Sequence, residues 1–196
     1  MARKPGARDR ARAEMAAAID AVFPLVLGLK QRKPAASLPR RLDALFRELS
    51  KPRPPRDPDQ IEELIWALWI GHEDQRAAMD MAAAVEAMAA GEMDLADAVF
   101  ERLVADFPQW AEAWNKRAIL DFIARRDARC VANIAAVLQI EPRHFGAVAG
   151  YAQVCLRQNR PREARAAFQV ALSINPHLQG LSEVIDEIAL GEGPVH

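Results

Sequence analysis

Residues 114–142 read WNKRAILDFIARRDARCVANIAAVLQIEP and hold most of one period of a pattern that recurs on both sides. The prolines Pro108, Pro142 and Pro176 are evenly spaced along the chain. A small residue lies twelve positions before each proline and a large apolar residue lies eight positions before it. These residues are Ala96, Cys130 and Ala164, and Phe100, Ile134 and Phe168. A fixed period of this length predicts stacked pairs of helices.

The pattern resembles that of the tetratricopeptide repeat (TPR) family, which places W-x2-L-G-x2-Y, A-x3-F and P in a unit of about 34 residues. Trp114 and Ala118 match it in the middle unit, and Ala164 and Phe168 match it in the last. Three units follow without a break, at residues 77–110, 111–144 and 145–178. The resemblance implies an all-α, TPR-type solenoid of helical hairpins that acts as a non-catalytic scaffold or adaptor for other proteins.

The physical pattern agrees with this prediction. Ala84, Ala118 and Ala152 lie one repeat length apart on the first helix of each pair, where small side chains allow two helices to cross closely. A single hairpin cannot bury its apolar face, so an array needs at least three units and a cap. Residues 179–196 are predicted to form a C-terminal capping helix and tail, because Leu181, Val184, Ile185 and Ile188 recur at helical spacing.

Composition favours helices, because the 196 residues are 51% hydrophobic and include only nine glycines. The net charge of −1 hides an asymmetry. Residues 1–60 hold 14 Lys and Arg against 7 Asp and Glu, whereas residues 61–196 hold 12 against 20. We expect the basic arm either to fold back on the acidic array or to reach an anionic lipid or nucleic acid, with no sequence-specific nucleic-acid motif.

The N-terminal extension, residues 1–56, is predicted to contain one or two amphipathic helices and a Pro-rich linker. Residues 15–29 are apolar and favour a docking helix that Pro24 kinks or interrupts, although their basic flank also resembles an export signal. The predicted location is cytoplasmic, with periplasmic or membrane-associated placement through residues 1–36 as the alternative. In that alternative the solenoid is mainly structural. No stretch reaches the roughly 20 apolar residues of a membrane span.

Residues 57–76 are predicted to form an N-terminal capping helix. Asp57 occupies the N-cap position and Pro58 the first helical position. Ile61–Ile70 is apolar nearly all round, so it must be covered on more than one side. We expect Trp66 and Trp69 to pack against the first repeat, with an exposed ligand-binding pair of tryptophans as the alternative.

No catalytic or metal site is predicted. The histidines at 72, 144, 177 and 196 are isolated, and no phosphate-binding glycine loop or nucleophile motif occurs. We therefore predict no enzyme activity, no cofactor and no metal. Cys130 and Cys155 fall at core-facing positions and are interpreted as small apolar fillers.

The period also locates a binding surface, because positions that face the partner helix fix which positions face the inner, concave side. The predicted groove residues are Met81, Val85, Met88, Asn115, Lys116, Ile119, Phe122, Gln153, Leu156 and Arg157. An apolar strip that contains Met suits a helical or extended segment of a protein or peptide partner. The segment Met15–Leu29 or Leu38–Leu49 of this chain is an equally weighted occupant, and homo-oligomerisation is left open.

Overall fold

The computed structural model describes residues 6–191, and every regular element within them is helical. The elements are α1 (Ala7–Leu27), a short 3-10 turn (Leu29–Gln31), α2 (Arg41–Leu49), α3 (Pro58–Ile70), α4 (Gln75–Ala89), α5 (Met93–Asp106), α6 (Ala111–Ile123), α7 (Asp127–Ile140), α8 (Phe145–Arg157), α9 (Pro161–Ile174) and α10 (Leu181–Gly191). The predicted tail beyond Gly191 and the first five residues lie outside this range.

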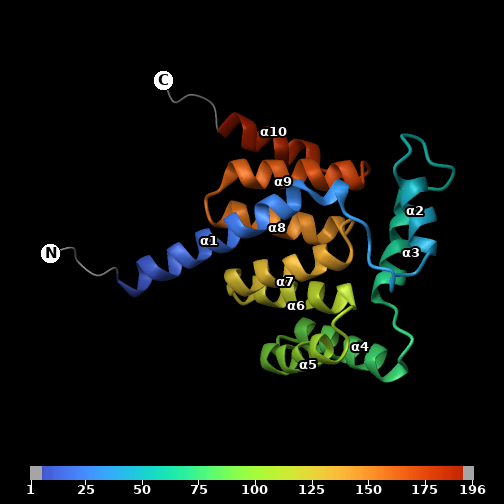
Figure 1. Ribbon diagram of the computed structural model, residues 1–196, viewed down its shortest axis with the longest axis horizontal. Coiled ribbons are helices and arrows are strands. Elements are labelled where there is room, and N and C mark those ends of the chain that lie inside the picture. Colours follow the sequence, from blue (N-terminus) through green and yellow to red (C-terminus); the bar gives the residue numbers. More distant parts are fainter. Residues whose placement is uncertain (1–5, 192–196) are drawn as a thin grey trace.

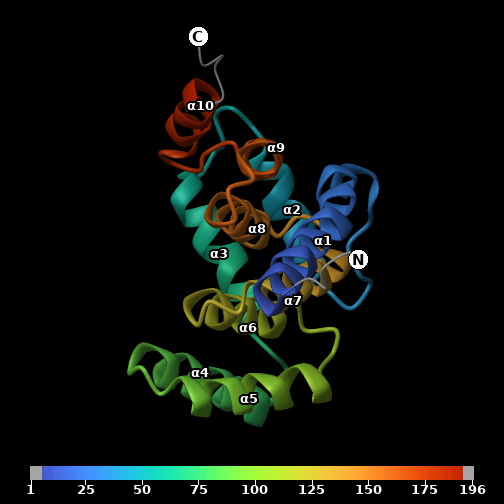
Figure 2. The same cartoon turned by 90° about the vertical axis from the view of Figure 1, so that its left-hand side faces the viewer.

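Three antiparallel pairs, α4–α5, α6–α7 and α8–α9, stack in chain order, and α10 follows on α9 (Figure 1). The view from the side shows the same succession of layers (Figure 2). Ala84, Ala118 and Ala152 are all buried, as the repeat period predicted. Small side chains at these positions let the two helices of a pair approach closely, and Phe100, Ile134 and Phe168 fill the core of the array.

The turn inside each pair has the same backbone conformation. Gly91, Arg125 and Asn159 occupy equivalent positions in the three pairs and have φ of 82°, 59° and 56°, in the left-handed region. The next amide in each turn donates to the carbonyl five residues earlier, as in Glu92 N–H to Ala87 at 2.9 Å. This bond defines a Schellman motif that ends the first helix. The repeat therefore fixes the turn as well as the helices.

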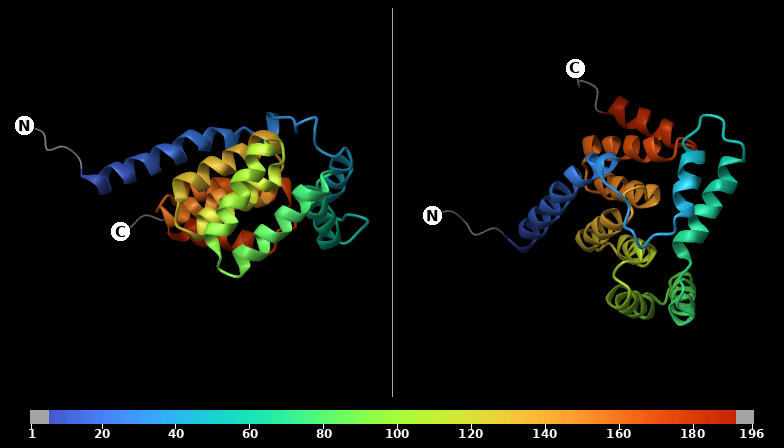
Figure 3. Two further views of the ribbon diagram at one scale, coloured as in Figure 1. Left: turned by 90° about the horizontal axis from the view of Figure 1, so that it is seen from below. Right: turned by 45° about the vertical axis from the view of Figure 1, so that its right-hand side comes forward.

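The N-terminal helix α1 packs across the outer side of the array against α7 and α9 (Figure 3, left). Met15, Ile19, Val22 and Val26 are buried there, and Tyr151 Oη donates to the Ile19 carbonyl at 2.8 Å. This face of the helix is thus buried against the second and third pairs. Neither α1 nor α2 fills the inner groove, contrary to the hypothesis of an internal occupant. Pro24 lies within α1 and does not interrupt it.

The N-terminal extension folds back on the array, but it is not held there by attraction between basic residues of the extension and acidic residues of the array. In two of its ion pairs with the array, the arm supplies the acid and the array supplies the arginine. Asp20 pairs with Arg160 at 2.5 Å, and Asp43 pairs with Arg143 at 2.6 Å. The apolar contact of α1 with α7 and α9 is therefore the main attachment, since exposed ion pairs contribute little.

The hairpin α2–α3 stands across the ends of the paired helices (Figure 1). Leu45, Leu49 and Ile65 are buried between the two helices, and Phe145 at the start of α8 joins the same cluster. Asp57 caps α3 by accepting the Asp59 amide at 3.0 Å. The expected stacking of Trp66 and Trp69 on the first pair is wrong, because both rings contact Phe145. The first pair meets α3 at the α5–α6 loop, where Trp110 Nε1 donates to the Trp69 carbonyl at 2.9 Å.

The left-handed turn gives a stability prediction. Gly91 has no atom within 4 Å of an added Cβ, so substitution there costs only backbone strain. We expect Gly91→Ala to lower the free energy of unfolding by about 1 kcal/mol, whereas Gly91→Asn costs less because Asn tolerates this conformation. Urea unfolding measures both. Equal losses for the two variants would contradict the assigned cause.

Candidate functional site

A pocket of about 230 Å³ lies on the inner side of the array between α6 and α8. Ile119 and Phe122 of α6 form one wall, and Gly146 and Gly150 of α8 form the opposite one. The remaining lining residues are Trp66, Asn115, Ala118, Cys130, Ile134, Ala147 and Gln153. The hollow exists because α8 presents glycines where α6 presents large side chains. It is mainly apolar.

Trp66 of α3 closes one side of this pocket. A Cβ added to Gly146 would lie 2.7 Å from Cη2 of Trp66, so the ring fits against bare backbone. Trp66 Nε1 donates to Glu62 at 3.2 Å, and the Lys116 ammonium lies 6.0 Å from the ring centroid. The tryptophan is thus held in place by its own helix and by the array.

A buried pair of polar side chains, His144 and Glu112, supports the side of the pocket that Trp66 closes. His144 Nδ1 accepts the Ala147 amide at 3.1 Å, so a neutral ring carries its proton on Nε2 and donates it to Glu112 at 3.0 Å. Trp69 stacks on the His144 ring with centroids 4.0 Å apart and planes 7° apart. The contact joins α3 to the second and third pairs.

The Glu112 carboxylate has further partners. Asn115 donates to it at 3.1 Å, and the Lys116 ammonium lies 3.2 Å away. Burial raises the pKa of this carboxyl group, but His144 and Lys116 lower it by more, so its pKa lies below the ordinary glutamate value. The side chain is therefore ionised at neutral pH and balanced by its neighbours.

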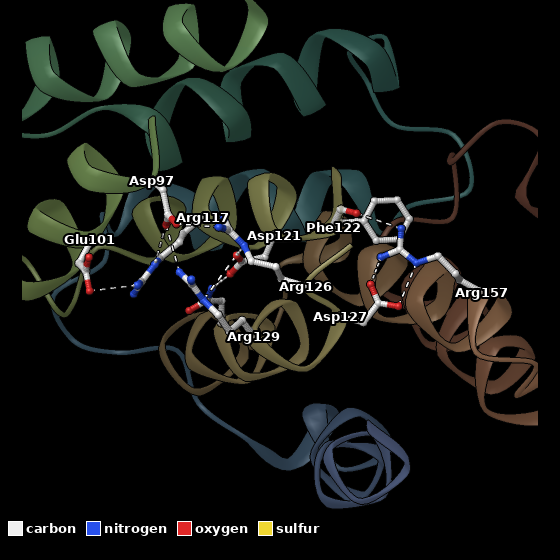
Figure 4. A network of polar contacts seen from close by, with 10 residues as sticks. Asp97, Glu101, Arg117, Asp121, Phe122, Arg126, Asp127, Arg129 and Arg157 are labelled. Carbon is white, nitrogen blue, oxygen red and sulfur yellow. Dashed lines mark hydrogen bonds and ion pairs between the residues drawn. The ribbon is translucent and has the colours of Figure 1, made fainter. Parts of the chain in front are cut away.

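A network of arginines and carboxylates ties the first two pairs together (Figure 4). Arg126 contacts Asp97 of α5 at 2.9 Å and Asp121 of α6 at 2.6 Å. Arg129 of α7 also reaches Asp97, at 3.0 Å. Burial raises the pKa of Asp121 despite Arg129 and Arg126 nearby. These bonds fix α6, which supplies one wall of the pocket.

A second group in Figure 4 fixes the end of α8. Arg157 pairs with Asp127 and donates from Nη1 to the Phe122 carbonyl at 2.9 Å. Its guanidinium lies 3.6 Å from the centroid of the Phe122 ring, which is a cation–π contact. The orientation of this pocket-wall ring is set by these contacts.

The structure brings together only part of the predicted groove set. Asn115, Ile119, Phe122 and Gln153 line the pocket. Lys116, Leu156 and Arg157 are half-buried beside these residues on α6 and α8, whereas Val85 and Met88 are half-buried on α4. Met81 is 1% exposed and belongs to the core of the first pair, so it offers no surface for binding.

The repeat register does not place Trp66 in the groove, because Trp66 precedes the first repeat. Its position depends on how α3 folds back across the array, and no local pattern encodes that path. The glycines Gly146 and Gly150 fall in the same register as the groove residues. Only the structure shows that they leave space opposite Ile119 and Phe122. Ile134 and Cys130 reach the pocket floor from α7.

Other chemistry has little support in the described part of the chain. Cys130 and Cys155 are buried, and burial raises the pKa of each thiol to about 12, which disfavours a reactive thiolate. Within residues 6–191, no three His, Cys, Asp or Glu side chains are grouped to hold a metal ion. No helix in that range has the length and hydropathy to cross a membrane.

The fold and its period define a repeat protein of stacked helical hairpins. No family model matches the sequence. A protein of Rhizobium etli named TPR repeat-containing protein is 29% identical over 161 residues, which are 82% of this chain and 79% of the relative. This similarity confirms the predicted resemblance to the TPR family and the all-α solenoid class. Such arrays generally offer extended concave surfaces for binding other proteins.

The contact of Trp66 with Gly146 gives one prediction. Gly146→Ala should force the indole away, lower the free energy of unfolding by about 1–3 kcal/mol and shift the tryptophan fluorescence. Gly150→Ala is the matched control, because its Cβ would meet only Ile134 Cδ1 at 3.7 Å. The free energy of unfolding of Gly150→Ala should rise by up to about 1 kcal/mol, because alanine has a higher helix propensity than glycine. A stable Gly146→Ala protein with unchanged fluorescence would contradict the wall assignment.

The depressed pKa of Glu112 gives a second prediction. A carboxyl group whose pKa is lower in the folded state stabilises the protein above its unfolded pKa, and this stability is lost as the pH falls. Glu112→Gln should cost about 2 kcal/mol at pH 7. The difference from wild type should shrink below about pH 4.3, the ordinary glutamate value. Denaturant unfolding at a series of pH values measures this difference in the free energy of unfolding. A difference that stays constant down to pH 3 would show that the Glu112 carboxylate does not stabilise the fold through its lowered pKa.

Proposed function

We propose that the inner surface of α4, α6 and α8 binds a helical or extended segment of a partner protein, and that the pocket between α6 and α8 receives an apolar side chain of that segment. The observation that carries this proposal is the pocket itself, which several helices of the folded chain build and no segment of residues 6–191 fills. The chain then acts as a non-catalytic interaction scaffold.

The size and walls of the pocket support a side chain as the occupant. Sites for whole small molecules measure roughly 300–1,000 Å³. This pocket is smaller, about 230 Å³, and it adjoins half-buried apolar residues on α6 and α8. A peptide anchored there by one side chain also has neighbouring surface to cover, as in the recognition of a helix laid in a groove.

The packing of α1 supports this proposal over attachment to a membrane surface. Four apolar side chains of α1, Met15, Ile19, Val22 and Val26, are buried against the array, and of its large apolar side chains Leu27 is the one that is mostly exposed, at 51%. Releasing the four buried side chains would expose apolar surface on α7 and α9 as well. The inner groove, in contrast, is open without any rearrangement.

A peptide-display experiment tests the proposal. A random library of peptides about 16 residues long, roughly four helical turns, is selected on the immobilised full chain, and the affinity of enriched peptides is measured by fluorescence anisotropy. We expect Gly150→Leu, which fills the pocket, and Ile119→Glu, which places a charge in it, to weaken binding roughly tenfold or more.

Leu95→Glu is the matched control, because Leu95 is an apolar residue of α5 that is 53% exposed and outside the pocket. Thermal unfolding verifies that each variant is folded. The proposal is wrong if no peptide is enriched, or if enriched peptides bind the two pocket variants as tightly as they bind wild type.

A further inference from the structure

The repeat register continues beyond the pocket and describes the whole inner face. Equivalent positions of successive repeats place Met88, Phe122, Leu156 and Leu190 in one row across α4, α6, α8 and α10. The first three side chains are half-buried, and Leu190 is 83% exposed. The row is apolar along its full length, so it suits the apolar face of a helix.

The adjacent row changes character along the array. It runs through Val85, Ile119, Gln153 and Glu187 at the same spacing, and so passes from apolar to acidic. Glu183, one turn earlier on α10, is also exposed. The C-terminal end of the inner face therefore carries carboxylates on the helix that follows the last pair.

A second set of acids lies on α3, beside the same end. Trp66 borders both the apolar pocket and a hollow of about 410 Å³ lined by Asp59, Glu62 and Glu63 together with His177, Leu178 and Gln179 of the α9–α10 turn. Asp59 and Glu63 are exposed there, whereas Glu62 is held by Trp66 and Asn175. We name Asp59, Glu63, Glu183 and Glu187 the acidic rim.

The cations of the predicted groove set do not offset this rim. Lys116 is paired with Glu112, and Arg157 with Asp127, and their side chains are only 19% and 16% exposed. The array as a whole is also acidic, since residues 61–196 hold 12 Lys and Arg against 20 Asp and Glu. The acidic rim thus presents four exposed carboxylates, while the neighbouring α2–α3 loop, whose Lys51 carbonyl contacts His177, carries the exposed cations Lys51 and Arg53.

We propose that the partner is a basic amphipathic helix of another protein, with apolar side chains on the Met88–Leu190 row and lysines or arginines facing the acidic rim. This inference rests on the proposed function and adds the chemistry of the partner to it. Charge complementarity of this kind steers association and selects among partners more than it adds affinity.

Two designed peptides test the inference on the full chain. Each has about five helical turns and the same Leu face, and one carries Lys on both flanks where the other carries Glu. We expect the Lys peptide to bind roughly tenfold tighter in about 50 mM salt, and this preference to shrink at high salt because screening weakens exposed charge pairs.

Charge-reversed variants locate the preference. Glu63→Lys and Glu187→Lys should each reduce the preference for the Lys peptide roughly threefold. Asp106→Lys changes the net charge equally, on the exposed end of α5 and away from the rim, and should leave the preference intact. Gly150→Leu should weaken both peptides and leave their ratio unchanged.

The outcomes separate this inference from the proposed function. If the two peptides bind equally and Gly150→Leu weakens both, the proposal of a basic partner is wrong, but the proposal that the groove binds a peptide stands. If Gly150→Leu does not change the affinity of either peptide, both the proposed groove and the proposed basic partner are wrong. Failure of the Lys peptide to bind at about 1 mM, a binding free energy of about −4 kcal/mol, also overturns the inference. So does a concentration-dependent dimer that Gly150→Leu abolishes, because a second copy would then occupy the groove.

Discussion

The array is built on the close approach of paired helices at alanine-sized side chains. Ala84, Ala118 and Ala152 are buried at equivalent positions of α4, α6 and α8, so each pair repeats the geometry of the one before it. Because each pair contacts mainly its neighbours, the array grows in one direction and keeps an inner and an outer side. The pocket exists because α8 adds two glycines, Gly146 and Gly150, to this arrangement.

Two N-terminal elements clamp the array without filling its inner side. Helix α1 lies across α7 and α9 on the outside, and the hairpin α2–α3 lies across the helix ends (Figure 3). Stacking of Trp69 on His144, and the bond from His144 to Glu112, join the hairpin to two repeats at once. Because Trp66 is on the same helix, the clamp also builds the wall of the pocket and connects it to the acidic rim.

The sequence predicted what is local or periodic. The spacing of Pro108, Pro142 and Pro176 placed the pairs, and the register placed Ile119, Phe122 and Gln153 beside the pocket. The fold of the extension could not be predicted, because the path of α3 depends on distant contacts such as that between Trp69 and His144. Periodicity also misplaced Met81, since its inward register does not reveal that the first pair buries it.

We propose that binding takes place on the inner face and not on the outer face that α1 covers. Amide chemical-shift mapping of the full chain with a bound peptide tests this most directly. We expect shift changes that cluster at Ile119, Phe122, Gly150 and Gln153, with the amides of α1 unchanged. Shift changes concentrated on α1 and the outer sides of α7 and α9 would contradict it.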